Sequence, residues 1–400
     1  MKKRYLIPII CFLLPLVFFL VYSIFDEDKT FSDSENRELA TFPKFSAESY
    51  ADASFMQEFE TYYNDQFPFR EQFIALAKLY NSVMFPDFLL SDEDVLELDS
   101  SIVYKGRIIE KFSTDENTVS RYSAIVNKLY EECGSPETFV LIPPPPFELY
   151  APESYISSDN GFDKAFEMLG EKLEGPALVD IRKAFSDNKY EYLYFGTDHH
   201  WTARGAHLAA NEFLKAAEGE ELPSIDDYKS GKRDGFLGSL YKAVMTEKAG
   251  SILENYPDSV EYFYPLADAT VTAYTSAKME IGEERQVLYP DYNETTNLYC
   301  IYMGGDIALG KIETETKNGK SMLVVRDSYG HALIPFLIDA YETIYTVEPR
   351  YFNEANKLEL GKFFKENEVD TLLFVGYPQM AVGSYWDTMA KYLEYLLVIE

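Results

Sequence analysis

The pattern of apolar positions divides the chain into three segments. Residues 5–25 are uncharged and almost continuously apolar, and residues 46–85 carry a helical period that Pro68 interrupts. From Val103 onward, short apolar runs alternate with amphipathic stretches. This alternation is typical of a sheet covered by helices on both faces. The pattern therefore predicts a helical arm followed by an α/β domain.

Within the α/β domain, five apolar runs have the length and composition of buried strands. These are Phe139–Ile142, Tyr190–Phe195, Met322–Val325, Thr343–Val347 and Thr371–Val375. The stretches with a 3.6-residue period predict helices at Asn117–Glu132, Asp163–Leu173, Thr202–Ala217, Asn353–Asn367 and Ser384–Leu397. In the last of these, Ser384 and Asp387 are placed as a cap and its third-position acid. Residues 225–302 are rich in tyrosine and turns, lack this alternation, and are interpreted as an insertion.

The N-terminus indicates a compartment. Lys2, Lys3 and Arg4 precede the apolar run, which is long enough to cross a bilayer. A secretory signal peptide is the alternative, but its apolar core is shorter and ends in small residues. With the basic residues held inside, everything from Asp26 onward is expected outside the membrane. We therefore predict a transmembrane signal anchor at 1–25, a helical arm at 26–98 and the α/β domain at 99–400.

Composition narrows the classes of partner. The chain holds 36 Lys and Arg against 67 Asp and Glu, a formal charge of −31. Such a charge repels phosphate backbones, so nucleic acid is not expected as a partner. Aromatic residues make up 16% of the chain. They supply enough apolar surface for a hydrophobic core, so the high acidity does not indicate an intrinsically disordered chain. Cys133 and Cys300 allow at most one disulfide, and two unpaired buried thiols are expected instead.

The predicted strands also place the chemistry. In an open α/β sheet the ligand site lies outside the carboxyl ends of the strands. The residues that follow the predicted strands are therefore expected at one edge, and they include Asp198, His199, His200, Ser328, His331 and Arg350. The four prolines Pro143–Pro146 follow another strand and are expected to border the site.

Three of these residues have the chemistry of a nucleophilic site. A serine hydroxyl becomes a nucleophile when a histidine takes its proton and a carboxylate orients that histidine. Ser328 lies between a predicted strand and a predicted helix, and Asp198 and His200 are two residues apart. For each residue alone a structural interpretation is commoner, with Ser328 as a helix N-cap and Asp198 as a turn residue. Together the three favour catalysis.

A metal site is the other chemical interpretation. Asp198, His199, His200 and His331 provide histidines and a carboxylate of the kind that bind iron or zinc. Consecutive side chains in an extended loop point to opposite sides, which argues against His199 and His200 as joint ligands. No metal is therefore predicted. No cofactor is predicted either, because no cofactor motif is visible in the sequence.

Other residues near these motifs receive weaker assignments. His207 lies on an apolar helix face and is expected to be structural. Gly304 and Gly305 are candidate oxyanion donors, because glycine permits close approach of the backbone. Arg350 is expected to pair with a surface carboxylate or to hold an anionic sugar substituent, and the sequence does not choose.

The segments "GTDHHWTARGAHLAA" and "VVRDSYGHALIPFL" resemble the DHHW family of bacterial surface proteins, which is similar to the SGNH-like domain of alginate O-acetyltransferases. "SENRELATFPKF", "NDQFPFREQF" and "EPRYF" follow in the same order. The resemblance implies an SGNH-hydrolase-like three-layer sandwich with a mostly parallel sheet. It also implies Ser328 as nucleophile, His200 as base and Asp198 as orienting acid. The candidate neighbours of this site are His199, Trp201, Asp327, Tyr329, His331 and Arg350.

Two departures accompany the resemblance. The Asp-x-His loop precedes the serine, the reverse of the order in ordinary SGNH esterases, and their separate oxyanion Gly and Asn blocks have no evident counterpart. The expected function is an extracytoplasmic, membrane-anchored O-acyltransferase that acetylates a surface polysaccharide. A multi-pass membrane O-acyltransferase is the expected acyl donor. A polysaccharide acetylesterase and a non-catalytic polysaccharide-binding protein remain alternatives, and the tyrosines of 225–302 suit the last.

Overall fold

A computed structural model of the chain describes residues 6–26, 28–29, 31–32, 37–46, 54–70, 72–73, 76, 95–157, 159–275, 279, 281–293, 297–353, 356–384 and 388–398. The chain divides into two compact units. One contains Met1–Ser91 and Tyr241–Glu254, and the other contains Asp92–Leu240 and Asn255–Glu400.

The first unit contains the N-terminal elements of the chain. These are α1 (Leu6–Phe25), β1 (Phe31–Ser32), β2 (Arg37–Glu38), α3 (Ser54–Asp65), most of α10 (Ser239–Val244) and α11 (Lys248–Leu253). The helical prediction for 46–85 holds at α3, whereas residues 77–85 lie outside the described residues. Counting only what the structure describes, no helix is both long and apolar enough to span a membrane.

The side chains of Asp65 and Gln66, at the C-terminal end of α3, hydrogen-bond to the backbone of the segment that precedes the helix. The Gln66 amide accepts from the Lys29 backbone N–H at 2.9 Å and donates to the Lys29 carbonyl at 2.9 Å. It also donates to the Ala40 carbonyl at 3.0 Å, and Asp65 accepts from the Ala40 N–H at 2.8 Å. The Asp-Gln pair of "NDQFPF" thus satisfies backbone groups that are not paired in a helix or sheet.

The second unit is built on one large sheet with the order β11-β10-β12-β14-β13-β15-β6-β7. Strands β14 (Thr343–Val347), β13 (Ser321–Arg326), β15 (Thr371–Val375), β6 (Glu137–Leu141) and β7 (Ala177–Leu178) run parallel. Strands β12 (Leu309–Thr314), β10 (Ala269–Tyr274) and β11 (Gly282–Arg285) continue it with antiparallel pairs. A mixed α/β fold with a mostly parallel sheet is thereby confirmed.

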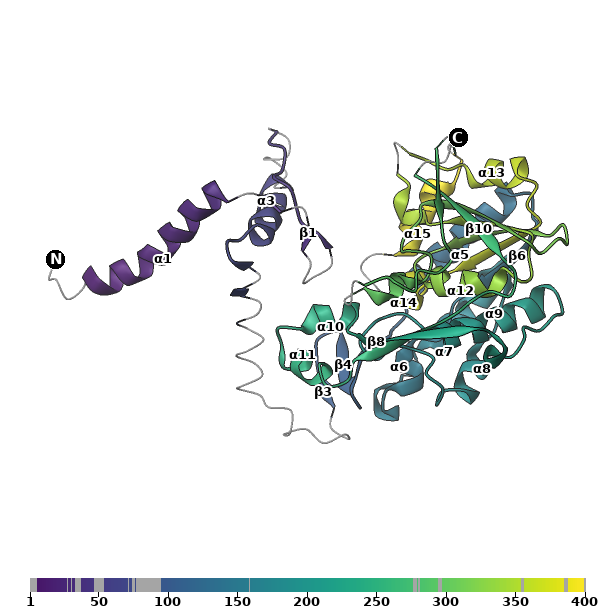
Figure 1. Ribbon diagram of the computed structural model, residues 1–400, viewed down its shortest axis with the longest axis horizontal. Coiled ribbons are helices and arrows are strands. Elements are labelled where there is room, and N and C mark those ends of the chain that lie inside the picture. The colour runs from purple at the N-terminus through teal and green to yellow at the C-terminus, as the bar shows by residue number, and fades with distance from the viewer. Residues whose placement is uncertain are drawn as a thin grey trace. The chain divides into compact units, whose positions relative to one another are not determined.

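Helices cover both faces of this sheet (Figure 1). Val324 packs into one core with α9 (Ala203–Ala217) and α12 (Tyr329–Leu337). Its neighbour Leu323 packs into the other core with α5 (Glu116–Glu132), α7 (Phe162–Lys172), α13 (Leu360–Glu366) and α15 (Met389–Leu393). Successive side chains of a strand point to opposite faces, so a continuous apolar run fills both layers.

Smaller elements complete the second unit. Strands β3 (Leu96–Glu97), β4 (Ser101–Tyr104) and β5 (Arg107–Glu110) form an antiparallel sheet, and β8 (Ser230–Phe236) pairs with β9 (Asp258–Phe263). The short helices are α6 (Pro146–Tyr150), α8 (Arg182–Asp187) and α14 (Pro378–Ala381). Because β10 and β11 belong to the large sheet, residues 225–302 are in part a continuation of that sheet.

One predicted strand is wrong. Residues 190–195 form no strand, and only Tyr194 makes an isolated bridge, to Trp201. The backbone bonds within its own loop instead, since Thr202 N–H donates to the Leu193 carbonyl at 2.9 Å. The apolar character of this run reflects the buried side chains of Leu193, Tyr194 and Phe195 rather than sheet pairing. The other four predicted strands are confirmed.

The predicted helices differ mainly at the C-terminal end of the chain. Helices α5, α7 and α9 lie within a residue or so of the prediction, but α13 starts only at Leu360. Before it, the backbones of Asn353 and Asn356 hydrogen-bond to each other. The cap predicted at Ser384 is wrong, because Thr388 precedes α15 while the Ser384 hydroxyl donates to Asp115 at 3.0 Å. Asp387 lies outside the described residues.

The prediction of two unpaired, buried thiols at Cys133 and Cys300 is confirmed in part. Neither Cys133 nor Cys300 is in a disulfide. Cys133 is buried, whereas Cys300 is only half-buried.

Candidate active site

Ser328 occupies the turn between β13 and α12. It stands at the N-cap position of α12, as the structural interpretation expects, but its side chain makes no capping hydrogen bond. Instead its Oγ lies 2.7 Å from Nε2 of His200. The hydroxyl is thus directed at a base rather than used to cap the start of the helix.

His200 is joined on its other side to Asp198. Nδ1 of His200 lies 2.5 Å from Asp198 Oδ1, and the same oxygen accepts from the His200 backbone N–H at 3.0 Å. Asp198 Oδ2 accepts from the Ser239 N–H at 2.8 Å. Since a carboxylate accepts, Nδ1 carries the proton and Nε2 is left to accept from Ser328. Asp198 is therefore both a turn residue and the partner of the ring.

The Asp198 carboxyl remains ionised near neutral pH. Burial acts to raise its pKa, but the attraction of His200 and the hydrogen bonds it accepts outweigh burial and lower the pKa. Asp198 and His200 are both buried, at 4% and 7% exposed. A fixed negative charge in this dry position stabilises an imidazolium when His200 takes a proton.

Aromatic side chains hold the loop that carries His200 against α12. The Tyr299 ring stacks on the His200 ring with centroids 3.8 Å apart, and its hydroxyl donates to the Ser328 carbonyl at 3.0 Å. Trp201 Nε1 donates to the Tyr329 carbonyl at 3.0 Å. The Tyr329 hydroxyl donates to the His199 carbonyl at 2.6 Å. Sequence reasoning missed Tyr299, which has no motif around it.

His199 is a neutral neighbour of this arrangement. Its Nδ1 lies 2.6 Å from the Ser239 hydroxyl, and its ring centroid is 3.8 Å from that of His200. Burial, together with the charge of His200, lowers the pKa of His199 to about 3. Next to Ser239, Gly238 leaves no room for a side chain, because a Cβ there would overlap Asp198. The packing around the carboxylate thus depends on a glycine.

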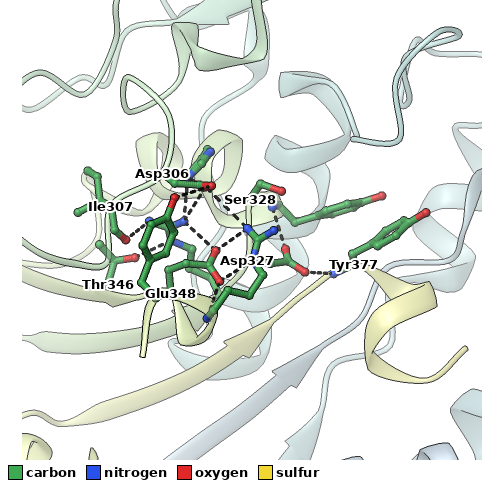
Figure 2. Close-up of polar contacts among 12 residues, drawn as sticks. Asp306, Ile307, Asp327, Ser328, Thr346, Glu348 and Tyr377 are labelled. Carbon is green, nitrogen blue, oxygen red and sulfur yellow. Dashed lines mark hydrogen bonds and ion pairs between the residues drawn. The ribbon is translucent and has the colours of Figure 1, made fainter. Parts of the chain in front are cut away.

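Asp327 connects two strand ends beneath Ser328. One carboxylate oxygen accepts from the Tyr329 N–H at 2.9 Å, and the other accepts from the Tyr377 N–H at 2.6 Å, as Figure 2 shows. Burial raises the pKa of Asp327. The Tyr377 hydroxyl bonds to Glu110, whose pKa burial also raises. Glu110 and Tyr377 were not identified from the sequence.

A buried charge network lies beside the turn (Figure 2). Arg326 donates from Nε to Thr346 Oγ1 at 2.9 Å and from Nη2 to the Ile307 carbonyl at 3.1 Å. Its Nη1 lies 2.7 Å from His331 Nε2 and 3.4 Å from Glu348. Burial and the Arg326 charge lower the pKa of His331 well below its usual value. The His331 side chain is thus bound to Arg326, while the His331 backbone N–H donates to the Ser328 carbonyl at 3.1 Å.

Arg350 belongs to the same network. It donates from Nε and Nη2 to Glu348, at 2.9 Å each. Asp306 lies 3.7 Å from Arg350 and 3.3 Å from His331. Arg350 therefore pairs with a carboxylate, as one interpretation expected, although Glu348 is buried rather than on the surface.

The other predicted residues have structural surroundings. His207 donates from Nε2 to the Pro223 carbonyl at 3.0 Å and packs edge-on against Phe336. The Gly305 N–H bonds within its own turn to the Tyr302 carbonyl at 3.3 Å. Among the described residues no contact joins Gly304 or Gly305 to Ser328, and their oxyanion role stays a prediction.

The metal interpretation has a geometric basis. Ligand atoms of Asp198, His199 and His200 lie within 4.8 Å of one another. The polar atoms of His200 and Asp198 are, however, already bonded to each other and to Ser328 and Ser239. An ion bound by all three would have to break these contacts, so this arrangement suits proton transfer better than metal binding.

The DHHW protein family matches residues 98–347. A DHHW family protein from Eubacterium siraeum is similar at 26% identity and a TM-score of 0.65, covering 77% of this chain and 99% of that one. Bacillus cereus PatB1 with a sulfonyl adduct is similar at 18% identity and a TM-score of 0.57, covering 76% and 99%.

The O-acetyltransferase domain of Pseudomonas putida AlgJ has 13% identity and a TM-score of 0.41, covering 76% of this chain and 98% of that domain. Among curated proteins no significant match is found. The family match covers more than half of the chain, and it includes the loop with Asp198 and His200 and the turn with Ser328. The chain belongs to the DHHW family.

Proposed function

We propose that the protein is an extracytoplasmic, membrane-anchored O-acyltransferase that acetylates a surface or secreted polysaccharide through an acyl-serine on Ser328. The observation that carries the proposal is the continuous hydrogen-bonded series from Ser328 Oγ to His200, 2.7 Å, and from His200 to Asp198, 2.5 Å. This is the arrangement that activates a serine for acyl transfer.

The reaction has two halves. In the first, His200 Nε2 takes the Ser328 proton while Oγ attacks the donor's acyl carbonyl, and the protonated His200 then returns that proton to the donor's leaving oxygen. In the second, His200 takes the proton of a sugar hydroxyl, whose oxygen attacks the acyl carbon and releases Ser328, which recovers the proton. Asp198 stabilises the imidazolium in both halves and holds its own charge throughout.

The donor and the location are also part of the proposal. The basic residues Lys2, Lys3 and Arg4 before an apolar run support an anchor with the remaining chain outside the cell. A multi-pass membrane O-acyltransferase would then supply the acyl group, by analogy with alginate acetylation. An alkaline phosphatase fused after Glu400 would be active if this orientation is right and inactive if it is wrong.

Covalent labelling tests the nucleophile. The full-length chain is treated with phenylmethylsulfonyl fluoride, a reagent for activated serines, and its intact mass is measured. PatB1, which shares the fold, is described with a sulfonyl adduct. We expect one adduct in the wild type, none in Ser328→Ala, and an unchanged adduct in Ser186→Ala, which removes an exposed serine elsewhere. No adduct on folded wild type, or an adduct that persists in Ser328→Ala, would contradict the proposal.

Turnover of p-nitrophenyl acetate tests the base and the metal alternative. We expect His200→Gln and Asp198→Asn to lower the rate of nitrophenol release by about 10³- to 10⁴-fold. EDTA should leave the wild-type rate unchanged, whereas a metal-dependent enzyme would lose it. Release that rises further when an oligosaccharide is added, with acetyl recovered on the sugar, separates a transferase from an acetylesterase that uses water.

A further inference from the structure

A concave site is lined in part by Gly196, two residues before Asp198 in the same loop. It has a volume of 530 Å³, within the usual range for ligand sites, and belongs entirely to the second unit. The residues that give it its chemistry are Lys105, Arg107, Arg204, Lys232, Tyr192 and Tyr256. None of them takes part in the proposed acyl transfer.

The charge of this pocket is opposite to that of the chain. Four cationic side chains line it, against the two carboxylates Asp258 and Glu261. The whole chain carries −31. An anionic polymer is repelled by most of such a surface, so a local excess of positive charge marks where it can approach.

These cations differ in how firmly they are already paired. Arg204 forms an ion pair with Glu261 at 2.6 Å. The Lys232 pair with Asp234, at 3.0 Å, is exposed and therefore weak. Among the described residues, Lys105 and Arg107 have no carboxylate partner; Arg107 donates to the Tyr194 carbonyl at 3.0 Å. Lys105, Arg107 and Lys232 are thus the side chains available to an anionic ligand.

The aromatic residues favour a sugar over a bare anion. Tyr256 is 47% exposed, and its ring lies directly against Gly106, where a Cβ would come within 2.5 Å of it. Tyr192 lines the same wall, with the Arg107 guanidinium 5.6 Å from its ring centroid. Aromatic faces held in place in this way pack on the apolar faces of sugar rings.

One wall residue of the pocket is hydrogen-bonded to the loop that carries Asp198. Its buried wall residue Asp258 accepts from the Gly196 and Thr197 N–H groups, at 2.7 Å each, and from the Thr197 hydroxyl at 2.5 Å. Asp198 is the next residue. A polymer held in the pocket therefore lies beside the loop that positions His200.

We propose that this pocket binds a carboxylate-bearing segment of the polysaccharide and holds it beside the loop that carries Asp198 and His200. The identification of the ligand as a polysaccharide rests on the proposed function. The pocket itself does not, and its binding is measured without turnover.

The test uses the full-length chain with Ser328→Ala, titrated calorimetrically with trigalacturonate at low salt. We expect saturable binding that weakens about tenfold or more in Lys105→Glu/Lys232→Glu. Both lysines are exposed, so the change should leave the fold intact. The matched control Lys128→Glu/Lys164→Glu reverses two exposed lysines outside the pocket and should bind as the parent does.

Two further ligands distinguish recognition of the carboxylates from recognition of the sugar rings. Maltotriose, which has no carboxylate, should not bind, and tricarballylate, which has no sugar ring, should bind more weakly than trigalacturonate. The proposal is overturned if trigalacturonate does not bind, if binding survives the pocket charge reversal, or if either comparison ligand binds equally well. If the protein binds trigalacturonate but forms no adduct on Ser328, this inference holds and the proposed acyltransferase function is contradicted.

Discussion

At the scale of single residues, the candidate site works by separating the charge states of neighbouring side chains. Asp198 and His199 are adjacent in the sequence, yet the pKa of Asp198 is lowered by His200 and hydrogen bonds while that of His199 is lowered mainly by burial. One therefore remains an anion and the other a neutral ring. His200, between this anion and Ser328, is left as the group that exchanges a proton.

His199 makes stability depend on pH. An unfolded histidine binds a proton below about pH 6.5, whereas folded His199 stays neutral down to about pH 3. Between these values the unfolded state binds more protons, so stability falls as the pH falls, by at most about 1.4 kcal/mol per pH unit from this group. We expect His199→Asn to show a smaller loss of melting temperature between pH 7 and pH 5 than the wild type.

The measurement is a thermal melt of both proteins at each pH. His331 and His207 also have lowered pKa values, so part of the acid sensitivity should remain in His199→Asn. An equal or larger loss in the variant would show that His199 is protonated in the folded chain.

At the scale of elements, the turn from β13 into α12 sets the position of Ser328. Gly330, in the first turn of α12, lies against the side chain of Arg326 at the end of β13. Arg326 is held by Thr346, Ile307 and His331 and has little freedom to move. The strand and the helix can therefore meet this closely only with glycine at 330.

Substitution of this glycine should be costly. In Gly330→Ala the new Cβ would lie 2.7 Å from Arg326 carbons, so we expect a destabilisation of about 1–3 kcal/mol and loss of most esterase activity. The matched control is Gly170→Ala in α7, whose Cβ would lie at an ordinary 3.6 Å from Leu178. That change should be neutral or stabilise by about 0.5–1 kcal/mol. Urea unfolding of both variants measures the difference, and equal effects would refute the packing argument.

At the scale of the whole molecule, the excess of acidic residues acts on stability. A formal charge of −31 means that folding brings like charges together, while exposed ion pairs contribute only about 0–1 kcal/mol each. Salt screens both effects. Because the repulsion extends over the whole surface, we expect its screening to stabilise the fold by more than the screening of ion pairs destabilises it.

We therefore expect the melting temperature at pH 7 to rise by several degrees between 20 and 200 mM NaCl. The control is the same pair of melts at pH 4.5, near the isoelectric point of about 4.5, where net repulsion vanishes and the rise should disappear. A fall in melting temperature with salt at pH 7 would indicate that ion pairs outweigh repulsion.

Much of the fold was predictable because its signal is local. The strands β6, β13, β14 and β15 are continuous apolar runs, since both faces of the sheet are covered, and such runs are visible in the sequence. Residues 190–195 looked the same but form no strand. Burial alone makes a run apolar, and only pairing with a partner strand decides whether it joins a sheet.

The sequence by itself determined the α/β class, the central strands and the choice of Asp198, His200 and Ser328 as chemically linked residues, because side-chain type and spacing carry that information. Tertiary structure alone decided that Tyr299 stacks on His200 and that Asp327 bonds the Tyr377 backbone. It also decided that a basic pocket lies beside the loop that carries Asp198 and His200. These contacts join residues 50 to about 100 positions apart, often through backbone groups that every residue possesses. No local pattern encodes them, so only the folded chain reveals them.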